Sequence, residues 1–357
     1  MRIGILTFSL HGGGAERMVS RLANAFVRKG IEVDILLLYD TEGKAYYLED
    51  AVRVVDVCDK SQNLLKKRSV QIKKLRRYLR VNEPDVILSF IYTTLPFPVI
   101  AERGLKHKIK IIGTQRTNPK VLKKIYNLMV MPFLRRTDGF IFQTKGAQEC
   151  YPVWLQKNSI IIPNIAPAVE TLPQDKRLKN SICTVGRFSK SKDYETLFKA
   201  MKMVIDELPD ACLYVYGEGE KKEEYISCLK EMGISDSVIF AGFSKNVVED
   251  IKKYEVFLFS SKAEGMPNSL AEAMAAGLAC VATDCEFGPS DLIHDGENGY
   301  LVPVSGFKEM AEKAIRLLKD DELRSVISEE ASKISEYYSE EKITDRFLTY
   351  ITGICEG

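Results

Sequence analysis

Short apolar runs rich in β-branched residues alternate with amphipathic stretches along most of the chain, which is the pattern of parallel sheets built from β-α-β units. In the first half, such runs predict strands over residues 2–8, 32–38, 85–91, 110–114 and 139–143. The same rhythm returns later, with strands predicted over residues 181–186, 211–217, 237–242, 256–261, 278–284 and 299–303. The pattern therefore predicts an α/β protein with two similar domains in succession.

The two halves are separated by residues 163–180, where prolines precede the polar segment QDKRLKN, a composition typical of a linker. We expect a Rossmann-like domain over residues 1–165 and a second one over residues 175–339, with a helix at residues 340–357 packing back onto the first. Open parallel sheets bind ligands at the carboxyl ends of their strands. Two domains that face each other are therefore expected to hold a ligand in the cleft between them.

Length and composition agree with this organisation. The chain has 357 residues, of which 45% are hydrophobic and 28% charged, as in globular proteins of about two domains. No segment has the roughly 18 consecutive apolar residues of a membrane span, and the N-terminal MRIGILTFSL lacks a cleavage pattern, so we expect a cytosolic protein. None of the eight cysteines forms a C-x-x-C pair, and five of them (150, 183, 212, 228 and 280) lie in apolar or helical contexts, which predicts free buried thiols and no zinc site.

The net charge of +2 conceals an asymmetry between the two halves. Residues 1–170 hold 28 Lys and Arg against 15 Asp and Glu, whereas the remainder holds 23 against 34. We therefore expect the first half to favour an anionic partner, and the second half not to.

Residues 64–80, LLKKRSVQIKKLRRYLR, predict a basic amphipathic helix. Leu65, Ile72, Leu75 and Leu79 can share one of its faces, and eight Lys or Arg surround them. Such a helix could attach to an anionic membrane surface, or it could be an ordinary solvated helix whose apolar face packs on the sheet. The helix alone leaves both open, and the basic first half favours the membrane.

The segment LHGGGAER, residues 10–17, follows the first strand and opens a helix. Its three glycines let the backbone approach a ligand, and the N–H groups of a helix N-terminus favour an anion. Arg17 stands where a dinucleotide-binding fingerprint has its third glycine, so the segment does not match that fingerprint. It could be an anion-binding loop, with His11 as a further ligand contact, or a flexible turn.

The segment VGRFSKSKDY, residues 185–194, places Arg187 just after a strand and Lys192 at the start of the next helix. The arginine fork binds two phosphate oxygens and the lysine adds a mobile charge, so the two side chains suit a diphosphate. The alternative is two solvated surface charges.

The segment EGMPNSLAEAMAAG, residues 264–277, holds Glu264 in a loop and Glu272 in the first turns of a helix. Pro267 and Asn268 predict the helix start, with Asn268 as its cap. Each carboxylate could accept hydrogen bonds from both hydroxyls of a sugar diol. Backbone N–H groups could meet a phosphate or sugar oxygen at Gly265, Met266 and Ser269. The alternative is two ordinary glutamates near a helix start.

Taken together, these segments resemble the retaining glycosyltransferases of family 4, which have the two-domain GT-B fold. The likeness covers nearly the whole chain, through GGGAER, PNIAP, GRFSKSKDY, the E-x7-E segment and GPSDLIHDGENGYLVP, in that order. It implies that the first domain binds an acceptor and the second a nucleotide-sugar. Within the family the likeness is to bacterial enzymes that extend lipid-linked oligosaccharides or surface polysaccharides on the cytoplasmic face of the membrane. No nucleic-acid partner is expected.

The resemblance also implies roles for the candidate residues. Arg187 and Lys192 are expected to bind the donor diphosphate and to form the catalytic set with Glu264, which contacts the hydroxyls of the donor sugar. Glu272 is expected to hold the ribose. The other donor contacts that it implies, or that the backbone pattern suggests, are Gly13, Gly14, Gly242, Phe243, Gly265, Met266, Asn268 and Ser269.

The chain departs from the family pattern at GTQRTNP, where many relatives carry a histidine near the reacting centre and this chain has Arg116. Arg116 cannot act as a base at neutral pH, but it could stabilise phosphate charge or bind an anionic acceptor. No D-x-D pair follows a predicted strand, so we expect neither a metal nor another cofactor. We expect front-face substitution that moves a hexose or an N-acetylhexosamine from a UDP-sugar, with Arg187 and Lys192 stabilising the leaving diphosphate.

Two alternatives remain open. One is an NAD-type oxidoreductase with Asp40 as its ribose carboxylate, which the absent third glycine opposes. The other is a non-catalytic subunit that binds a nucleotide-sugar, which the complete set of Arg187, Lys192, Glu264 and Glu272 opposes.

Overall fold

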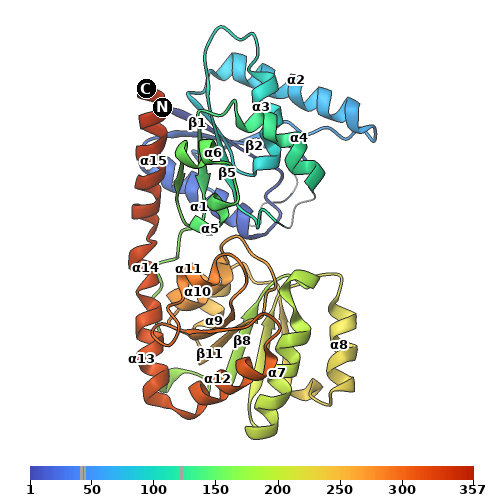
Figure 1. Ribbon diagram of the computed structural model, residues 1–357, viewed down its shortest axis with the longest axis vertical. Helices are drawn as coiled ribbons and strands as arrows, with labels where there is room; N and C mark the ends of the chain where they lie inside the picture. Colours follow the sequence, from blue (N-terminus) through green and yellow to red (C-terminus); the bar gives the residue numbers. More distant parts are fainter. Residues whose placement is uncertain (41–42, 44–45, 121–123) are drawn as a thin grey trace. The chain divides into compact units, whose positions relative to one another are not determined.

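The computed structural model describes residues 1–40, 43, 46–120 and 124–357, which form two compact units (Figure 1). Unit 1 comprises Met1–Ile165 and Glu340–Gly357, and unit 2 comprises Ala166–Ser339. Each unit has its own parallel β-sheet, covered by helices, and its own apolar core.

The sheet of unit 1 has the strand order β3-β2-β1-β4-β5-β6-β7, and its described pairings are all parallel. The strands are β1 (Arg2–Thr7), β2 (Glu32–Leu37), β3 (Arg53–Asp56), β4 (Val86–Ser89), β5 (Lys110–Gln115), β6 (Gly139–Phe142) and β7 (Ser159–Ile161). The order reverses between β1 and β4, and a reversal of this kind is where open α/β sheets bind ligands.

The helices of unit 1 connect these strands. They are α1 (Gly14–Arg28), α2 (Leu64–Asn82), η1 (Tyr92–Thr94), α3 (Pro96–Ala101), α4 (Lys124–Leu134), α5 (Lys145–Glu149), α6 (Val153–Lys157) and α15 (Glu340–Glu356). The Asn63 side chain caps α2 by accepting from the N–H groups of Leu65 and Lys66 at 3.0 and 3.1 Å. At the other end of α2, Glu83 adopts a left-handed conformation, which stops the helix.

The C-terminal helix α15 belongs to unit 1 although it follows unit 2 in the sequence. The Phe347 ring meets the Phe26 ring of α1 edge to face, with centroids 6.4 Å apart. The Tyr350 hydroxyl accepts a hydrogen bond from the Phe140 N–H of β6 at 3.1 Å, and Arg28 of α1 pairs with Glu340. Both apolar and polar contacts therefore fix α15 on α1 and β6.

The sheet of unit 2 has the strand order β10-β9-β8-β11-β12-β13. The strands are β8 (Ser181–Val185), β9 (Cys212–Tyr216), β10 (Val238–Gly242), β11 (Val256–Phe259), β12 (Ala279–Thr283) and β13 (Tyr300–Val302). Here the order reverses between β8 and β11, so the loops that follow these two strands are neighbours at the carboxyl edge of the sheet.

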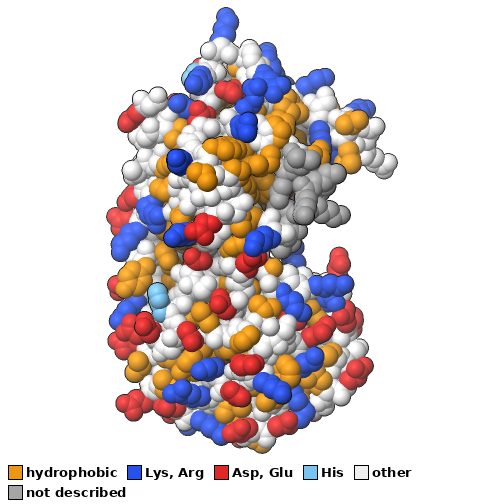
Figure 2. Space-filling model, in the orientation of Figure 1, with side chains coloured by type: hydrophobic (Ala, Val, Ile, Leu, Met, Phe, Trp, Pro, Cys, Tyr) orange, Lys and Arg blue, Asp and Glu red, His pale blue; other side chains and the backbone are white. Residues whose placement is uncertain are grey.

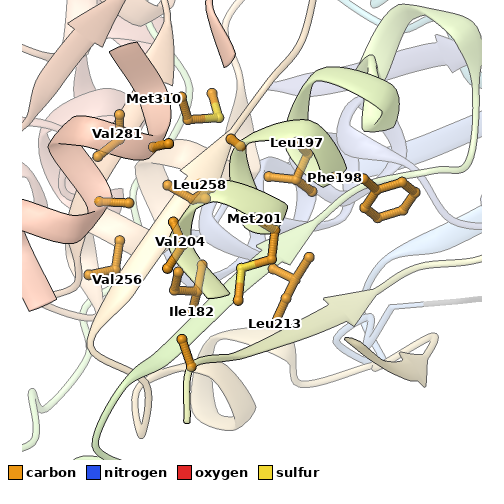
Figure 3. Close-up of a cluster of buried hydrophobic side chains, with 14 of the residues drawn as sticks. Ile182, Leu197, Phe198, Met201, Val204, Leu213, Val256, Leu258, Val281 and Met310 are labelled. Atoms are coloured by element: carbon orange, nitrogen blue, oxygen red, sulfur yellow. The ribbon is translucent and has the colours of Figure 1, made fainter. Parts of the chain in front are cut away.

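The helices of unit 2 cover both faces of its sheet. They are η2 (Gln174–Lys176), η3 (Lys190–Lys192), α7 (Tyr194–Glu207), α8 (Lys222–Glu231), η4 (Ser235–Ser237), α9 (Val247–Ile251), α10 (Asn268–Ala275), α11 (Pro289–Leu292), α12 (Phe307–Lys319), α13 (Asp321–Ser332) and α14 (Ile334–Tyr337). Figure 3 shows the core on one face, where Leu197 and Met201 of α7 and Met310 of α12 pack with Leu213 and Leu258 of the sheet. Burial of such side chains contributes roughly 1.5–3 kcal/mol each.

The strands predicted from the sequence are all present, with bounds that differ by at most two residues. The predictions missed β3 and β7, which contain four and three residues and lie at the two edges of the unit 1 sheet. Such short edge strands carry too few residues for alternation to be recognised. None of the described helices combines the length and the apolar composition needed to cross a membrane.

Candidate active site

The strand order of unit 2 brings the loop after β8 beside the loop after β11. The first loop carries Arg187 and Lys192, and the second carries Glu264. Residues 72 positions apart in the sequence therefore meet at the carboxyl edge of one sheet, which is the place where α/β sheets bind nucleotides.

Lys192 and Glu264 form an ion pair in which Lys192 Nζ donates to Glu264 Oε1 at 2.7 Å. Their side chains are 22% and 16% exposed, so the pair is only partly solvated. The Lys192 ammonium also lies 5.2 Å from the centroid of the Phe259 ring at the end of β11, a favourable cation–π distance. The sequence predicted both residues as site residues, but not that they pair with each other.

Arg187 is exposed, and its backbone is held on both sides. The Gly186 N–H donates to the Tyr216 carbonyl at 2.9 Å, and the Phe188 N–H donates to the Glu218 carbonyl at 3.0 Å. These two bonds extend the β8-β9 pairing beyond the end of the sheet. The guanidinium is therefore carried on a loop whose backbone is fixed.

The two backbone hydrogen bonds that hold the Arg187 loop against the segment after β9 require glycines at two positions of that segment. A Cβ on Gly217, whose φ is +150°, would lie 1.9 Å from the Gly186 carbonyl oxygen. A Cβ on Gly219 would lie 2.6 Å from the Phe188 carbonyl oxygen. We did not predict a role for these glycines, and the G-x-G spacing at the end of a predicted strand was the available signal.

The turn before α10 differs by one residue from the prediction. Asn268 is the first helical residue, and Pro267 occupies the cap position. The Pro267 carbonyl accepts the first hydrogen bond of the helix from Ala271 at 3.2 Å. The prediction of Asn268 as the cap was therefore wrong, and both Asn268 and Ser269 lie half-buried in the first turn.

The turn formed by residues 264–267 packs closely against Gly288. Gly265 and Met266 are buried, and a Cβ on Gly288 would lie 2.5 Å from Pro267 Cδ and 2.8 Å from the Gly265 carbonyl oxygen. Gly288 has a φ of +98°, so glycine is favoured there for its conformation as well. Glu272 of α10 is only 2% exposed, and its expected contact with a ribose stays a prediction.

Gly242 ends β10 and Phe243 follows it, at the same edge of the sheet. Gly242 has a φ of +77°, and its carbonyl accepts from the Gly217 N–H at 2.9 Å. The Phe243 ring is 53% exposed. The resemblance implied that backbone groups near these two residues meet the base, and this stays a prediction.

In unit 1, α1 begins at Gly14, and the Gly13 carbonyl accepts its first hydrogen bond from the Arg17 N–H at 3.0 Å. His11 precedes this turn, and its Nε2 lies 2.6 Å from Asp40 Oδ2 in the loop after β2. Asp40, the ribose ligand of the oxidoreductase alternative, therefore contacts a side chain of the chain itself. The roles expected of Gly13, Gly14 and His11 toward a ligand stay predictions.

Arg116 is buried inside unit 1. Its guanidinium lies 4.7 Å from the centroid of the Phe90 ring and 5.4 Å from that of Phe347. It donates to Thr114 Oγ1 and Asn164 Oδ1, both at 3.3 Å, and burial lowers the pKa of Arg116 to about 9. This packing does not favour the predicted contact with a phosphate or an acceptor, which stays untested.

The basic helix α2 packs on unit 1 by only part of its length. Leu75 and Leu79 are buried in the core, whereas Leu64 and Leu65 are 69% and 80% exposed. Leu65 is exposed because α2 buries residues only from Gln71 onward. Figure 2 shows basic and apolar side chains together on the face of unit 1 that carries α2.

All eight cysteines are free. Of the five predicted to be buried, Cys183 and Cys280 are buried, Cys212 and Cys228 are half-buried, and Cys150 is exposed, so the prediction of a buried thiol was wrong for Cys150. The short helix α5 ends just before Cys150 and leaves it at the surface. Within the described part of the chain, no three His, Cys, Asp or Glu side chains gather as metal ligands.

Comparison with known proteins places this geometry in a family. The model Glycosyltransferase Family 4 matches residues 12–164, and the model Glycosyl transferases group 1 matches residues 170–334. The two matches meet at the boundary between unit 1 and unit 2.

Relatives of known sequence align over the whole chain. An N-acetylgalactosaminyltransferase of Campylobacter jejuni, whose name gives a diacetylbacillosaminyl-diphospho-undecaprenol acceptor, is 28% identical over 99% of this chain and 100% of its own. A second C. jejuni N-acetylgalactosaminyltransferase, also named for an undecaprenol-linked acceptor, is 26% identical over 99% of each chain.

A solved structure agrees with these alignments. Staphylococcus aureus TarM, crystallised as a mutant with UDP, Fondaparinux and alpha-GlcNAc-glycerol, superposes with a TM-score of 0.83 at 16% identity, over 98% of this chain and 99% of its own. At that identity the likeness shows the fold. The two Rossmann-like units, the two consecutive family matches and this superposition together show that the chain belongs to the family 4 glycosyltransferases and has the GT-B fold.

Proposed function

We propose that the protein moves a hexose or an N-acetylhexosamine from a UDP-sugar to a glycan acceptor, with retention at the anomeric carbon and without a metal ion. The observation that carries this proposal is the Lys192–Glu264 pair at the carboxyl edge of the unit 2 sheet, with Arg187 in the same loop as Lys192. These side chains supply cations for a diphosphate beside a carboxylate for sugar hydroxyls. The UDP bound to S. aureus TarM supports UDP as the nucleotide.

In the proposed reaction the bond between the anomeric carbon and the diphosphate oxygen breaks while the acceptor oxygen attacks from the same face. The proton of the acceptor hydroxyl passes to the leaving phosphate oxygen, so no protein base is required. Arg187 and Lys192 stabilise the charge that develops on the diphosphate. Glu264 holds hydroxyls of the transferred sugar, and Glu272 holds the ribose.

Further contacts complete the proposed donor site. Gly242 and Phe243 would meet the base, and the backbone of residues 265–269 would meet phosphate or sugar oxygens. Gly13 and Gly14 of unit 1 would approach the donor phosphates, where the N-terminus of α1 favours an anion. His11 would contact the acceptor or a phosphate.

We propose further that the acceptor is lipid-linked and that the protein works at the cytoplasmic face of a membrane. The names of the two C. jejuni relatives support an undecaprenol-linked acceptor. On α2, the exposed Leu64 and Leu65 stand next to Lys66, Lys67 and Arg68. Apolar side chains beside a basic cluster suit the interface of an anionic bilayer.

Calorimetry of UDP binding in EDTA tests the donor site. The wild type should bind UDP but not NAD, Arg187→Ala and Glu272→Ala should bind it more weakly, and Lys230→Ala on the exposed face of α8 should match the wild type. Binding that needs a divalent metal, or that is unchanged in both site variants, would contradict the proposal. A UDP-sugar screen with NMR of the product anomer then tests transfer and retention, and binding without transfer or hydrolysis would favour the non-catalytic alternative.

Sedimentation with vesicles tests the membrane contact. Binding to vesicles that contain phosphatidylglycerol should fall in a Leu64→Ser, Leu65→Ser double variant and at high salt. Val81→Ser is the matched control, because Val81 is 71% exposed at the other end of α2. Equal loss in the control, or no binding by the wild type, would argue against this surface.

A further inference from the structure

Asp193 follows Lys192 directly and has an unusual environment for a residue at a helix start. Its backbone is left-handed, with φ 48° and ψ 51°, and its side chain is only 3% exposed. Lys262 Nζ donates to Asp193 Oδ1 at 2.9 Å, while Thr196 Oγ1 and Ser305 Oγ donate to Oδ2 at 2.7 and 3.2 Å. The buried carboxylate is thus compensated by three donors.

Two further hydrogen bonds join the loop after β8 to the loop after β11 just before Asp193. The Lys262 N–H donates to the Ser191 carbonyl at 2.8 Å, and Ser260 Oγ donates to the Lys192 carbonyl at 2.8 Å. Lys262 and Ser260 lie in the loop that carries Glu264. The peptide units that flank Lys192 are therefore fixed to the loop of its ion-pair partner.

An ordinary capping role does not account for Asp193. It occupies the N-cap position of α7, but its side chain makes no hydrogen bond to a backbone N–H of that helix. Its charged contact is instead to Lys262, in the loop after β11. A left-handed backbone is adopted most easily by glycine, so the position holds a carboxylate where backbone conformation alone favours another residue.

We infer that Asp193, through Lys262, is a positioning residue that sets the distance between the Lys192 ammonium and the Glu264 carboxylate for a donor diphosphate. It touches neither the donor nor the reacting atoms, and acts by fixing the loop after β8 on the loop after β11. The inference rests on the proposed function, because it takes Lys192 as a diphosphate ligand.

The test compares UDP with uridine, which lacks the diphosphate, by calorimetry and NMR titration of Asp193→Asn and Asp193→Gly. Asparagine keeps the size of the side chain and tolerates a left-handed backbone, and glycine adopts this backbone conformation without strain. Both variants should fold with a cooperative thermal transition, bind UDP about tenfold more weakly through misplacement of Lys192, and bind uridine as the wild type does. Removal of an anion beside a diphosphate site would by itself strengthen UDP binding, so the expected sign distinguishes positioning from charge.

Lys192→Ala and Lys262→Gln complete the design. If the two loops are fixed by the Asp193–Lys262 pair, the Asp193→Asn, Lys262→Gln double variant should bind UDP no more weakly than the worse single variant. UDP binding by Asp193→Asn that equals or exceeds the wild type, while Lys192→Ala weakens it, would overturn the inference and leave the proposed donor site intact. Equal losses for UDP and uridine would overturn it in favour of a purely structural role. A wild type that does not bind UDP, or a Lys192→Ala variant that binds it normally, would overturn the proposed donor site and the inference with it.

Discussion

Lys192 Nζ donates to Glu264 Oε1 at 2.7 Å, so the cation proposed for the donor diphosphate is held by the carboxylate proposed for the donor sugar. A diphosphate that reaches Lys192 must share this ammonium with Glu264 or displace the carboxylate. The ion pair therefore keeps the cation in place before the donor binds, and it also competes with the donor for that cation.

The competition gives Glu264→Gln opposite effects on binding and on transfer. Removal of the anion should strengthen UDP binding by about fivefold, or about 1 kcal/mol, because the diphosphate no longer competes with a charge near Lys192. Transfer should slow by roughly a hundredfold, since the amide is a weaker acceptor for the sugar hydroxyls. Calorimetry with UDP and turnover with the UDP-sugar measure the two effects, and Glu223→Gln on α8 is the exposed control. Weaker UDP binding by Glu264→Gln would contradict the competition.

Gly217→Ala should damage the loop that carries Arg187. Its Cβ would lie 1.9 Å from the Gly186 carbonyl oxygen, so the β8 and β9 loops must separate. Gly233→Ala is a matched control, because Gly233 also has a positive φ, of +70°, but has no atom within 4 Å of the added Cβ. The control should lose about 1 kcal/mol of stability and keep its UDP affinity, whereas Gly217→Ala should lose both. Similar UDP affinity in the two variants would show that the close approach of Gly217 to Gly186 does not position Arg187.

Hydrophobic periodicity was sufficient to predict the two sheets, because buried parallel strands are continuous apolar runs and the turns between them are polar. The site predictions came from local segments, which named Lys192 and Glu264 as residues of one donor site but did not predict that the two side chains pair. The Asp193–Lys262 pair could not be predicted in the same way, since it joins loops that become neighbours only through the strand order of unit 2. The buried state of Arg116 was missed for a similar reason, because Phe347 reaches it from the far end of the chain.

The Arg324 guanidinium pairs with two carboxylates, one buried and one exposed, so the energetic contributions of the two ion pairs can be compared. Its Nη2 lies 2.9 Å from Glu255 Oε1 and 2.7 Å from Asp321 Oδ1, but the Glu255 side chain is 3% exposed and that of Asp321 is 69% exposed. Glu255→Gln should cost about 3 kcal/mol, because it leaves a buried charge without its buried partner. Asp321→Asn should cost less than about 1 kcal/mol, as for other exposed pairs.

Denaturant unfolding of both variants measures this difference. Burial raises the pKa of Glu255 even beside Arg324, so desolvation outweighs the attraction between the two charges. A Glu255→Met, Arg324→Met double variant should therefore be about as stable as the wild type. Equal costs for Glu255→Gln and Asp321→Asn would show that burial does not decide the strength of these contacts.

Arg116→Met tests whether this arginine is a packed residue or a ligand contact. Methionine keeps an unbranched side chain between the Phe90 and Phe347 rings, and Asn164 Oδ1 still accepts from Gln143 Nε2 at 2.6 Å. If Arg116 serves packing alone, the variant should keep its UDP affinity and its KM for the acceptor. Weaker UDP binding or a higher KM for the acceptor would instead support the contact with a phosphate or an acceptor predicted from the sequence.

The pH dependence of stability gives an independent measure of the buried Arg116. Burial lowers its pKa to about 9 from an ordinary value of 12.5, so between these values the folded state binds fewer protons than the unfolded state. The free energy of unfolding of the wild type should then rise relative to that of Arg116→Met as the pH increases from about 8 to about 10.5, by at most about 1.4 kcal/mol per pH unit. Other groups titrate in both proteins and cancel in the difference. The exposed Arg103→Met variant should show no such change relative to the wild type, and a flat difference for Arg116→Met as well would mean that its guanidinium is solvated in solution.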